Sequence, residues 1–127
     1  MSMDFELRDE LVRPYVLDGE IRGGISRLKC VPLNVLEKLI VHGFVRLGEW
    51  NSCGGVQDLF LPFLLRHPDF TAHGYAVSKE RRDSRIVIEG IECDAPMAIE
   101  TVIDFANTFR RADDFSLSSS RARCWYD

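Results

Sequence analysis

Residues 70–109 read FTAHGYAVSKERRDSRIVIEGIECDAPMAIETVIDFANTF and decide the fold class of this chain. Side chains in residues 70–77 alternate with a period of two, which is typical of a β-strand. The charged run 79–83 then leads to a β-branched segment, residues 85–91, that favours a second strand. The two segments together predict an antiparallel hairpin.

A helix is expected directly after the hairpin. Asp94 can cap its N-terminus, and Pro96 would lie in the first turn, where its missing N–H costs nothing. The expected buried stripe consists of Ile99, Val102, Ile103, Ala106 and Phe109. Burying each large member would contribute ~1.5 to 3 kcal/mol before entropy is subtracted. We therefore expect the helix to lie across the sheet and the substitution Ile103→Asp to abolish folding.

The remaining segments complete the secondary-structure prediction. A third strand is expected over residues 121–126, and the N-terminal part predicts a short helix over 5–13 and an extended piece over 25–31. A clear helix follows Pro32 and ends at Gly43. A second helix runs to about residue 66 with a break near Pro62.

These elements define an α+β fold in which N-terminal helices precede a β-β-α-β unit. The sheet is expected to be small and mainly antiparallel, with the helices packed on one face. With 127 residues and no composition shift, the chain is expected to form a single domain over residues 1–127.

Composition and charge restrict the cellular setting. The chain is 46% hydrophobic and 28% charged, as in ordinary soluble globular proteins. Neither a signal peptide nor a membrane-spanning run is recognisable, so we expect a cytoplasmic protein with reduced thiols at its four cysteines. The formal net charge of −4 disfavours nonspecific attraction to nucleic acid or anionic lipid.

Cys53 is the most chemically interesting residue. Its loop, NSCGG at residues 51–55, precedes an expected helix whose dipole and free N–H groups could stabilise a thiolate. His73 follows on the first hairpin strand, and Glu89 and Glu92 lie on or after the second. This order is compatible with a thiol hydrolase in which Cys53 is the nucleophile, His73 the base and a glutamate the orienting group. The alternative interpretation is that neither residue is catalytic: Cys53 is then a small residue at a helix start, and His73 is a strand residue that makes an ordinary hydrogen bond.

Other site chemistries have less support. His42, His67 and His73 lack the closely paired ligand spacing of a structural zinc site, so no metal is predicted. Neither pair of adjacent glycines is followed by the lysine and hydroxyl pattern of a P-loop, and no cofactor is predicted.

Nucleic-acid binding is the weaker alternative function. Two helices followed by a hairpin is the order of a winged-helix module, with Lys79, Arg81, Arg82 and Arg85 on the wing. The corresponding recognition helix, residues 57–65, is acidic or apolar where phosphate and base contacts need basic and amide groups. The alternative explanation of these basic residues is that they belong to a charged turn exposed to solvent.

Aromatic and apolar side chains leave the oligomeric state open. Phe60, Phe63 and Leu64 would lie on different sides of the second N-terminal helix, which is then either buried between layers or part of a homodimer contact. The leading hypothesis is a noncatalytic binding or regulatory domain, with self-association or a protein partner as an open alternative. A thiol-dependent hydrolase or transferase is the second hypothesis.

Overall fold

One antiparallel sheet organises the computed structural model, which describes residues 5–17, 24–45, 59–78, 82 and 84–126. The strand order across this sheet is β1 (Ile25–Val31), β2 (Thr71–Val77), β3 (Ile86–Cys93), β5 (Ala122–Trp125) and β4 (Asp114–Leu117). The predicted hairpin is confirmed as β2 and β3, and it is central because β1 pairs with β2 and β5 pairs with β3.

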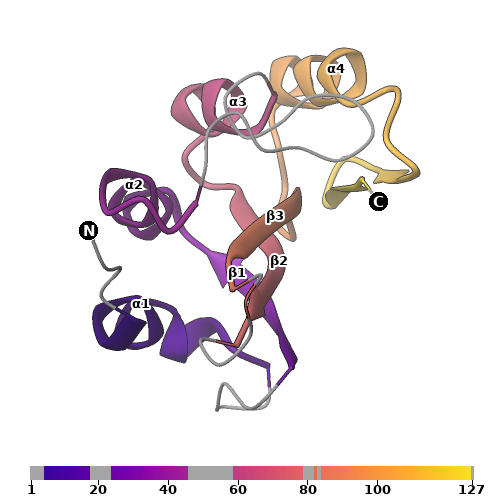
Figure 1. Cartoon of the computed structure of the whole chain (residues 1–127). Helices are drawn as coiled ribbons and strands as arrows, with labels where there is room; N and C mark the ends of the chain where they lie inside the picture. The colour runs from indigo at the N-terminus through magenta and orange to yellow at the C-terminus, as the bar shows by residue number, and fades with distance from the viewer. Residues whose placement is uncertain (1–4, 18–23, 46–58, 79–81, 83, 127) are drawn as a thin grey trace.

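The helices lie in two pairs (Figure 1). The first pair is α1 (Phe5–Val12), which a 3-10 turn over Arg13–Tyr15 extends, and α2 (Leu33–Val41). The second pair is α3 (Leu61–Arg66) and α4 (Ile99–Thr108). Pro62 lies in the first turn of α3 and so removes no internal helical hydrogen bond. Beyond α2, Gly43 has a φ of 79°, the left-handed conformation that glycine adopts most readily.

Strand alternation separates a core face of the sheet from a polar face. Leu28, Ala72, Ile88 and Ile91 belong to the same buried cluster as residues of all four helices. Their neighbours along the strands point the other way, because successive side chains alternate across a pleated sheet. The predicted α+β class, with an antiparallel sheet and helices on one face, is confirmed.

The C-terminal half departs from the prediction in two places. β4 was not expected, so the order from β2 onward is β-β-α-β-β. This edge strand has only four residues, and its alternation consists of just two apolar positions, Phe115 and Leu117. The second departure is the start of α4, whose N-cap is Ala98 and not Asp94. Pro96 disfavours helical backbone at the preceding residue, and the Met97 N–H instead donates to the Ser119 carbonyl.

The predicted stripe on α4 is wrong at Ile99 and Ile103. These side chains are 65% and 53% exposed, whereas Phe105 and Phe109 are fully buried. The two phenylalanines pack with Phe63 of α3, with ring centroids 5.8 and 5.0 Å apart. A helix this short presents only one narrow face to its neighbours, and the larger aromatic side chains occupy it.

We therefore expect Ile103→Asp to fold, contrary to the expectation from the sequence. Its exposed side chain leaves little apolar burial to lose, so the free energy of unfolding should fall by less than about 1 kcal/mol. Urea denaturation followed by circular dichroism measures the change, with Ile99→Asp as a matched exposed position. A loss of several kcal/mol in Ile103→Asp alone would show that this side of α4 is covered.

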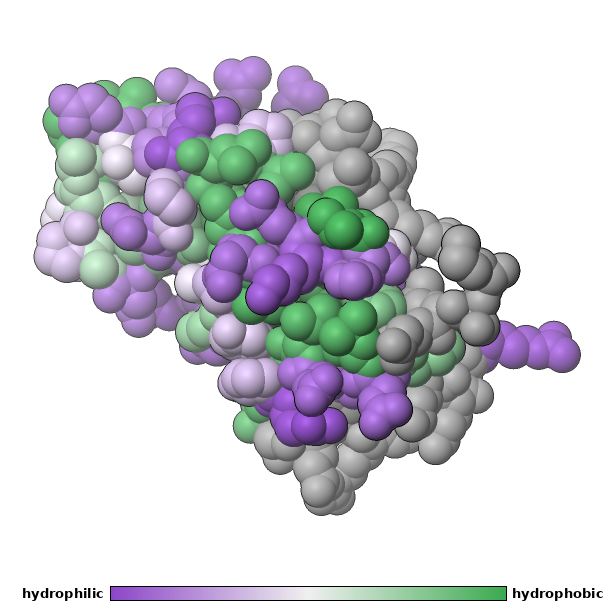
Figure 2. Space-filling view, turned by 90° about the vertical axis from the view of Figure 1, so that its left-hand side faces the viewer, coloured by the Kyte–Doolittle hydropathy of each residue, from purple (hydrophilic) through white to green (hydrophobic). Residues whose placement is uncertain are grey.

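Apolar side chains also reach the surface on the side that carries α1 and α2. Figure 2 looks onto this side and shows apolar residues in the middle of the face with hydrophilic residues around them. Val41 at the end of α2 is 81% exposed. Exposure of single apolar residues is common in folded domains. Within the described residues, no helix has the length and apolar character needed to cross a membrane.

Candidate functional site

The polar face of the sheet brings together residues from four strands. It is defined here by Arg27 of β1, His73 of β2, Glu92 of β3, and Arg123 and Trp125 of β5. Glu92 pairs with Arg123 in the register between β3 and β5, which places both side chains on one face. The face opposite the helices therefore carries a cluster of charged and aromatic side chains.

His73 is the buried centre of this cluster. Its side chain is 4% exposed, and neither ring nitrogen has a hydrogen-bond partner of good geometry. The ring lies 5.0 Å from that of Trp125. Buried polar groups are nearly always hydrogen-bonded in folded proteins, so an unpartnered imidazole is a feature that calls for a physical explanation.

Gly90 makes room for the His73 ring. It is the register partner of His73 on β3, next to the irregular pairing between His73 and Gly74. A Cβ on Gly90 would overlap the Cys124 carbonyl oxygen and lie 2.6 Å from His73 Nε2. The absence of a side chain at Gly90 thus lets β5 approach β3 closely and lets the imidazole lie over the strand.

Gly90→Ala is expected to destabilise the domain by about 1–3 kcal/mol, the usual range for overpacking. The added methyl group must displace β5 backbone, because the carbonyl it meets cannot rotate away as a side chain would. Thermal unfolding monitors the change. The double variant Gly90→Ala, His73→Ala should recover only part of the loss; full recovery would mean that the β5 backbone does not constrain this position.

Two arginines flank Trp125. The guanidinium carbons of Arg27 and Arg123 lie 4.6 and 5.1 Å from its ring centroid, within the range of cation–π interactions. Arg27 Nη2 also lies 3.0 Å from Glu89 Oε1, and the Glu89 side chain is only 10% exposed. These contacts hold Arg27 and Trp125 in place beside His73.

A hollow of about 200 Å³ lies over this cluster. Its described lining consists of Leu17, Arg27, Leu28, Lys29, His73, Glu92, Arg123 and Trp125. The hollow therefore combines three cationic side chains, one carboxylate, an indole and the buried imidazole. Such a mixture of apolar walls and a few converging polar groups is typical of sites for small ligands.

The surroundings of His73 strongly disfavour its protonation. Burial, followed by the nearby positive charges of Arg123, Arg27 and Lys29, lowers the pKa of His73 from 6.5 to about 4. The Cys124 carbonyl beside the ring acts in the opposite direction. The imidazole is consequently neutral at pH 7, with one nitrogen available to donate a hydrogen bond and the other to accept one.

The structure brings three of the four predicted catalytic residues to one face. His73 and Glu92 line the hollow, and Glu89 lies beside Arg27. Neither glutamate forms a hydrogen bond with His73. Cys53 lies outside the described residues, so the nucleophile role stays a prediction.

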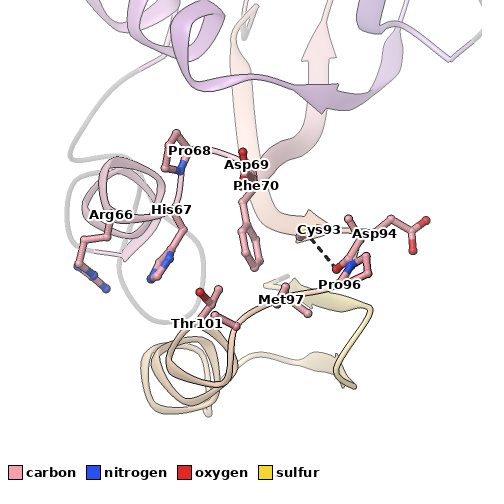
Figure 3. A pocket seen from close by; sticks show the side chains of 12 residues that line it. Arg66, His67, Pro68, Asp69, Phe70, Cys93, Asp94, Pro96, Met97 and Thr101 are labelled. Atoms are coloured by element: carbon pink, nitrogen blue, oxygen red, sulfur yellow. Dashed lines mark hydrogen bonds between the residues drawn. The ribbon is translucent and has the colours of Figure 1, made fainter.

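A larger cavity of about 540 Å³ lies between the end of α3 and the segment that joins β3 to α4. Figure 3 shows Arg66 and His67 at one side of it, Cys93 and Asp94 at the other, and Phe70 between them. The Cys93 thiol and the His67 ring therefore do not face each other, and this cavity does not contain a paired cysteine and histidine.

Asp104 connects α4 to α3 beside this cavity. Arg66 donates to both of its carboxylate oxygens at 3.0 and 3.2 Å, and His67 Nε2 lies 2.6 Å from Oδ2. The hydrogen bonds from Arg66 are the main cause that lowers the pKa of Asp104, although burial acts against them. This network explains why His67 and Asp104 lie together without implying catalysis.

Asp104→Asn is expected to lower the free energy of unfolding by about 1 kcal/mol at pH 7, since the ion pair is partly exposed. The pKa of Asp104 is lower in the folded state, so its contribution is complete above the ordinary aspartate pKa of 3.8 and is lost as the pH falls through the folded value. Chemical denaturation at pH 7 and pH 3 measures this. Asp69→Asn, an exposed position in the same cavity, is the control. An equal loss of stability in both variants would show that the contacts of Asp104 with Arg66 and His67 do not stabilise the fold.

The structure also bears on the alternative sites. The hairpin lies in the middle of the sheet, paired on both sides, and so does not project as a wing. Arg82 is exposed, while Lys79 and Arg81 lie outside the described residues. Within the part of the chain that the structure describes, no three histidine, cysteine, aspartate or glutamate side chains gather as metal ligands.

The aromatic side chains of the α3 region belong to the core. Phe60, Phe63 and Leu64 are each 3% exposed or less, and Phe60 packs against Phe109 and Tyr126. The sequence argument for a homodimer rested on a surplus of these residues. That surplus is absorbed within the chain, and self-association stays a prediction without this support.

No family model, curated protein or solved structure matches this chain. The candidate site therefore rests on its own geometry. Sequence reasoning found His73 and the two glutamates but missed Arg27, Arg123 and Trp125. The sequence could have indicated that Arg123 and Trp125 lie on the same face, because both belong to the predicted strand over residues 121–126 and are two positions apart.

Proposed function

We propose that this chain is a noncatalytic binding domain whose ligand site is the hollow over His73 and Trp125. The observation that carries the proposal is the His73 side chain, buried with both ring nitrogens unpartnered in a hollow lined by charged groups. A ligand that hydrogen-bonds to one ring nitrogen would offset part of the cost of burying the imidazole without partners. A cytoplasmic location remains part of this proposal.

Binding can be tested by nuclear magnetic resonance on isotope-labelled protein. The His73 Cε1–Hε1 and Trp125 Nε1–Hε1 signals are followed while acetamide, glycerol, sodium acetate and sodium phosphate are added separately. We expect at least one probe to shift both signals in a saturable manner, and the His73→Gln variant to lose the Trp125 response. Unchanged signals with all four probes would reject the site.

The alternative is a thiol-dependent hydrolase or transferase that uses Cys53 with His73 and Glu89 or Glu92. The observation in its favour is that the three described residues lie on one face of the sheet. The lowered pKa of His73 argues against it, because a general base works best with a pKa near the operating pH.

Turnover separates the two functions. Hydrolysis of p-nitrophenyl acetate is compared in the original protein, in Cys53→Ala and in Cys30→Ala, where Cys30 is an exposed free thiol. The binding proposal expects equally low rates in all three. A rate that disappears only in Cys53→Ala would overturn it in favour of the thiol enzyme.

A further inference from the structure

Positive charge dominates the hollow over His73, although the chain as a whole is acidic. Its formal net charge is −4, yet among the described residues the lining holds Arg27, Lys29 and Arg123 against the carboxylate of Glu92, while the neighbouring Glu89 is paired with Arg27. A concave surface lined by charge of one sign concentrates ligands of the opposite sign. The local charge is thus opposite to that of the whole molecule.

Arg27 and Arg123 differ in their freedom to meet a ligand. Arg27 is held by Glu89 at 3.0 Å. Arg123 stacks on Trp125 and, among the described residues, forms no salt bridge. A stacked guanidinium still presents its N–H groups at its edge, where they can bind an oxyanion through two parallel hydrogen bonds.

We propose that this hollow binds a small ligand through a carboxylate or phosphate group, which Arg123, Lys29 and the ring of His73 contact together. This inference rests on the proposed function, because it assigns a ligand class to the same site. Trp125 and the exposed Leu17 provide the apolar wall for the rest of the ligand. A volume of about 200 Å³ accommodates a small ligand.

His73 gives this site a dependence on pH. The groups that face its ring are Arg27 and Lys29 from β1, Glu89 and Glu92 from β3, and Arg123 with the Cys124 carbonyl from β5. Burial and the three cations hold the pKa of the ring down. A bound oxyanion supplies the opposite charge, so it raises the pKa of His73 and binds more tightly as the pH falls.

The test measures the pKa of His73 by nuclear magnetic resonance in sodium acetate, in sodium phosphate and in sodium chloride at equal ionic strength. We expect a saturable rise of about one unit or more with acetate or phosphate, and none with chloride. The probe that raises the pKa of His73 more shows whether the site prefers a carboxylate or a phosphate. Equal rises of the His73 pKa in all three salts would show that the ions only screen the charges of the neighbouring cations, and this result would overturn the proposal.

Matched variants assign the binding groups. Arg123→Gln should weaken binding of the effective probe by about tenfold or more, whereas Arg121→Gln, an exposed arginine on the same segment, should leave it unchanged. Lys29→Gln provides a second variant at an exposed position if Arg123→Gln does not fold. Equal affinities in the lining variant and the Arg121 control would overturn the proposal.

The probe panel distinguishes this inference from the proposed function. If acetamide or glycerol shifts the His73 signal while acetate and phosphate do not, the hollow is a binding site and the oxyanion assignment is wrong. If none of the four probes shifts the signal in folded protein, both proposals fail.

Discussion

An Arg8→Met variant is expected to lose about 3 kcal/mol of its unfolding free energy, because it removes the buried partner of an ion pair together with two hydrogen bonds. Arg8 is fully buried on α1, and its Nη1 donates to the Val77 carbonyl at 2.9 Å and to Ser84 Oγ at 3.0 Å. Its Nε and Nη2 both lie close to Asp9 Oδ1. Methionine fills the volume but leaves the half-buried Asp9 carboxylate without its cation.

Urea denaturation of Arg8→Met and Arg13→Met measures this effect. Arg13 is an exposed arginine on the adjoining 3-10 turn, so its replacement makes the same change in net charge without a buried partner. We expect Arg13→Met to unfold within about 0.5 kcal/mol of the original protein. Equal midpoints in the two variants would show that Arg8 does not anchor α1 to the hairpin.

The stability of the protein is expected to fall between pH 6.5 and about 4 because of His73. The pKa of this residue is 6.5 when unfolded and about 4 when folded, so the unfolded chain binds more protons in this range. Stability is therefore complete above pH 6.5 and declines as the pH falls toward the folded value. The full contribution is about 3 kcal/mol, since one pKa unit corresponds to 1.36 kcal/mol.

Chemical denaturation from pH 8 to pH 4 compares the original protein with His73→Gln and His42→Gln. Glutamine does not titrate in this range, so His73→Gln should lack the part of the decline in unfolding free energy that comes from protonation of His73. His42 is exposed, and its replacement should leave the pH profile unchanged. Parallel profiles for the original protein and His73→Gln would contradict the assignment.

The pattern of residues close together in the sequence was sufficient to predict most of the secondary structure. The alternation in residues 70–77 and the β-branched residues in 85–91 predicted the hairpin. Pro32 and Gly43 marked the two ends of the helix α2. These features depend on backbone preferences and on a period that neighbouring residues share. The edge strand β4 was not predicted because its four residues contain only two alternating apolar positions, Phe115 and Leu117.

Packing decided what local pattern could not. Ile99 and Ile103 have the spacing of a buried stripe, yet Phe105 of α4 and Phe109 at its C-cap are the residues that pack into the core against Phe63. Which face of an amphipathic helix is buried depends on the size and shape of the side chains that meet it, and these come from another helix.

By itself, then, the sequence determined the class of fold, the central hairpin and the place of His73 on one of its strands. The tertiary structure alone decided that His73 is buried beside Arg27, Arg123 and Trp125, from strands far apart in the chain. The physical reason is the strand register: hydrogen bonding between β1, β2, β3 and β5 selects which side chains share a face, and no single segment encodes that choice.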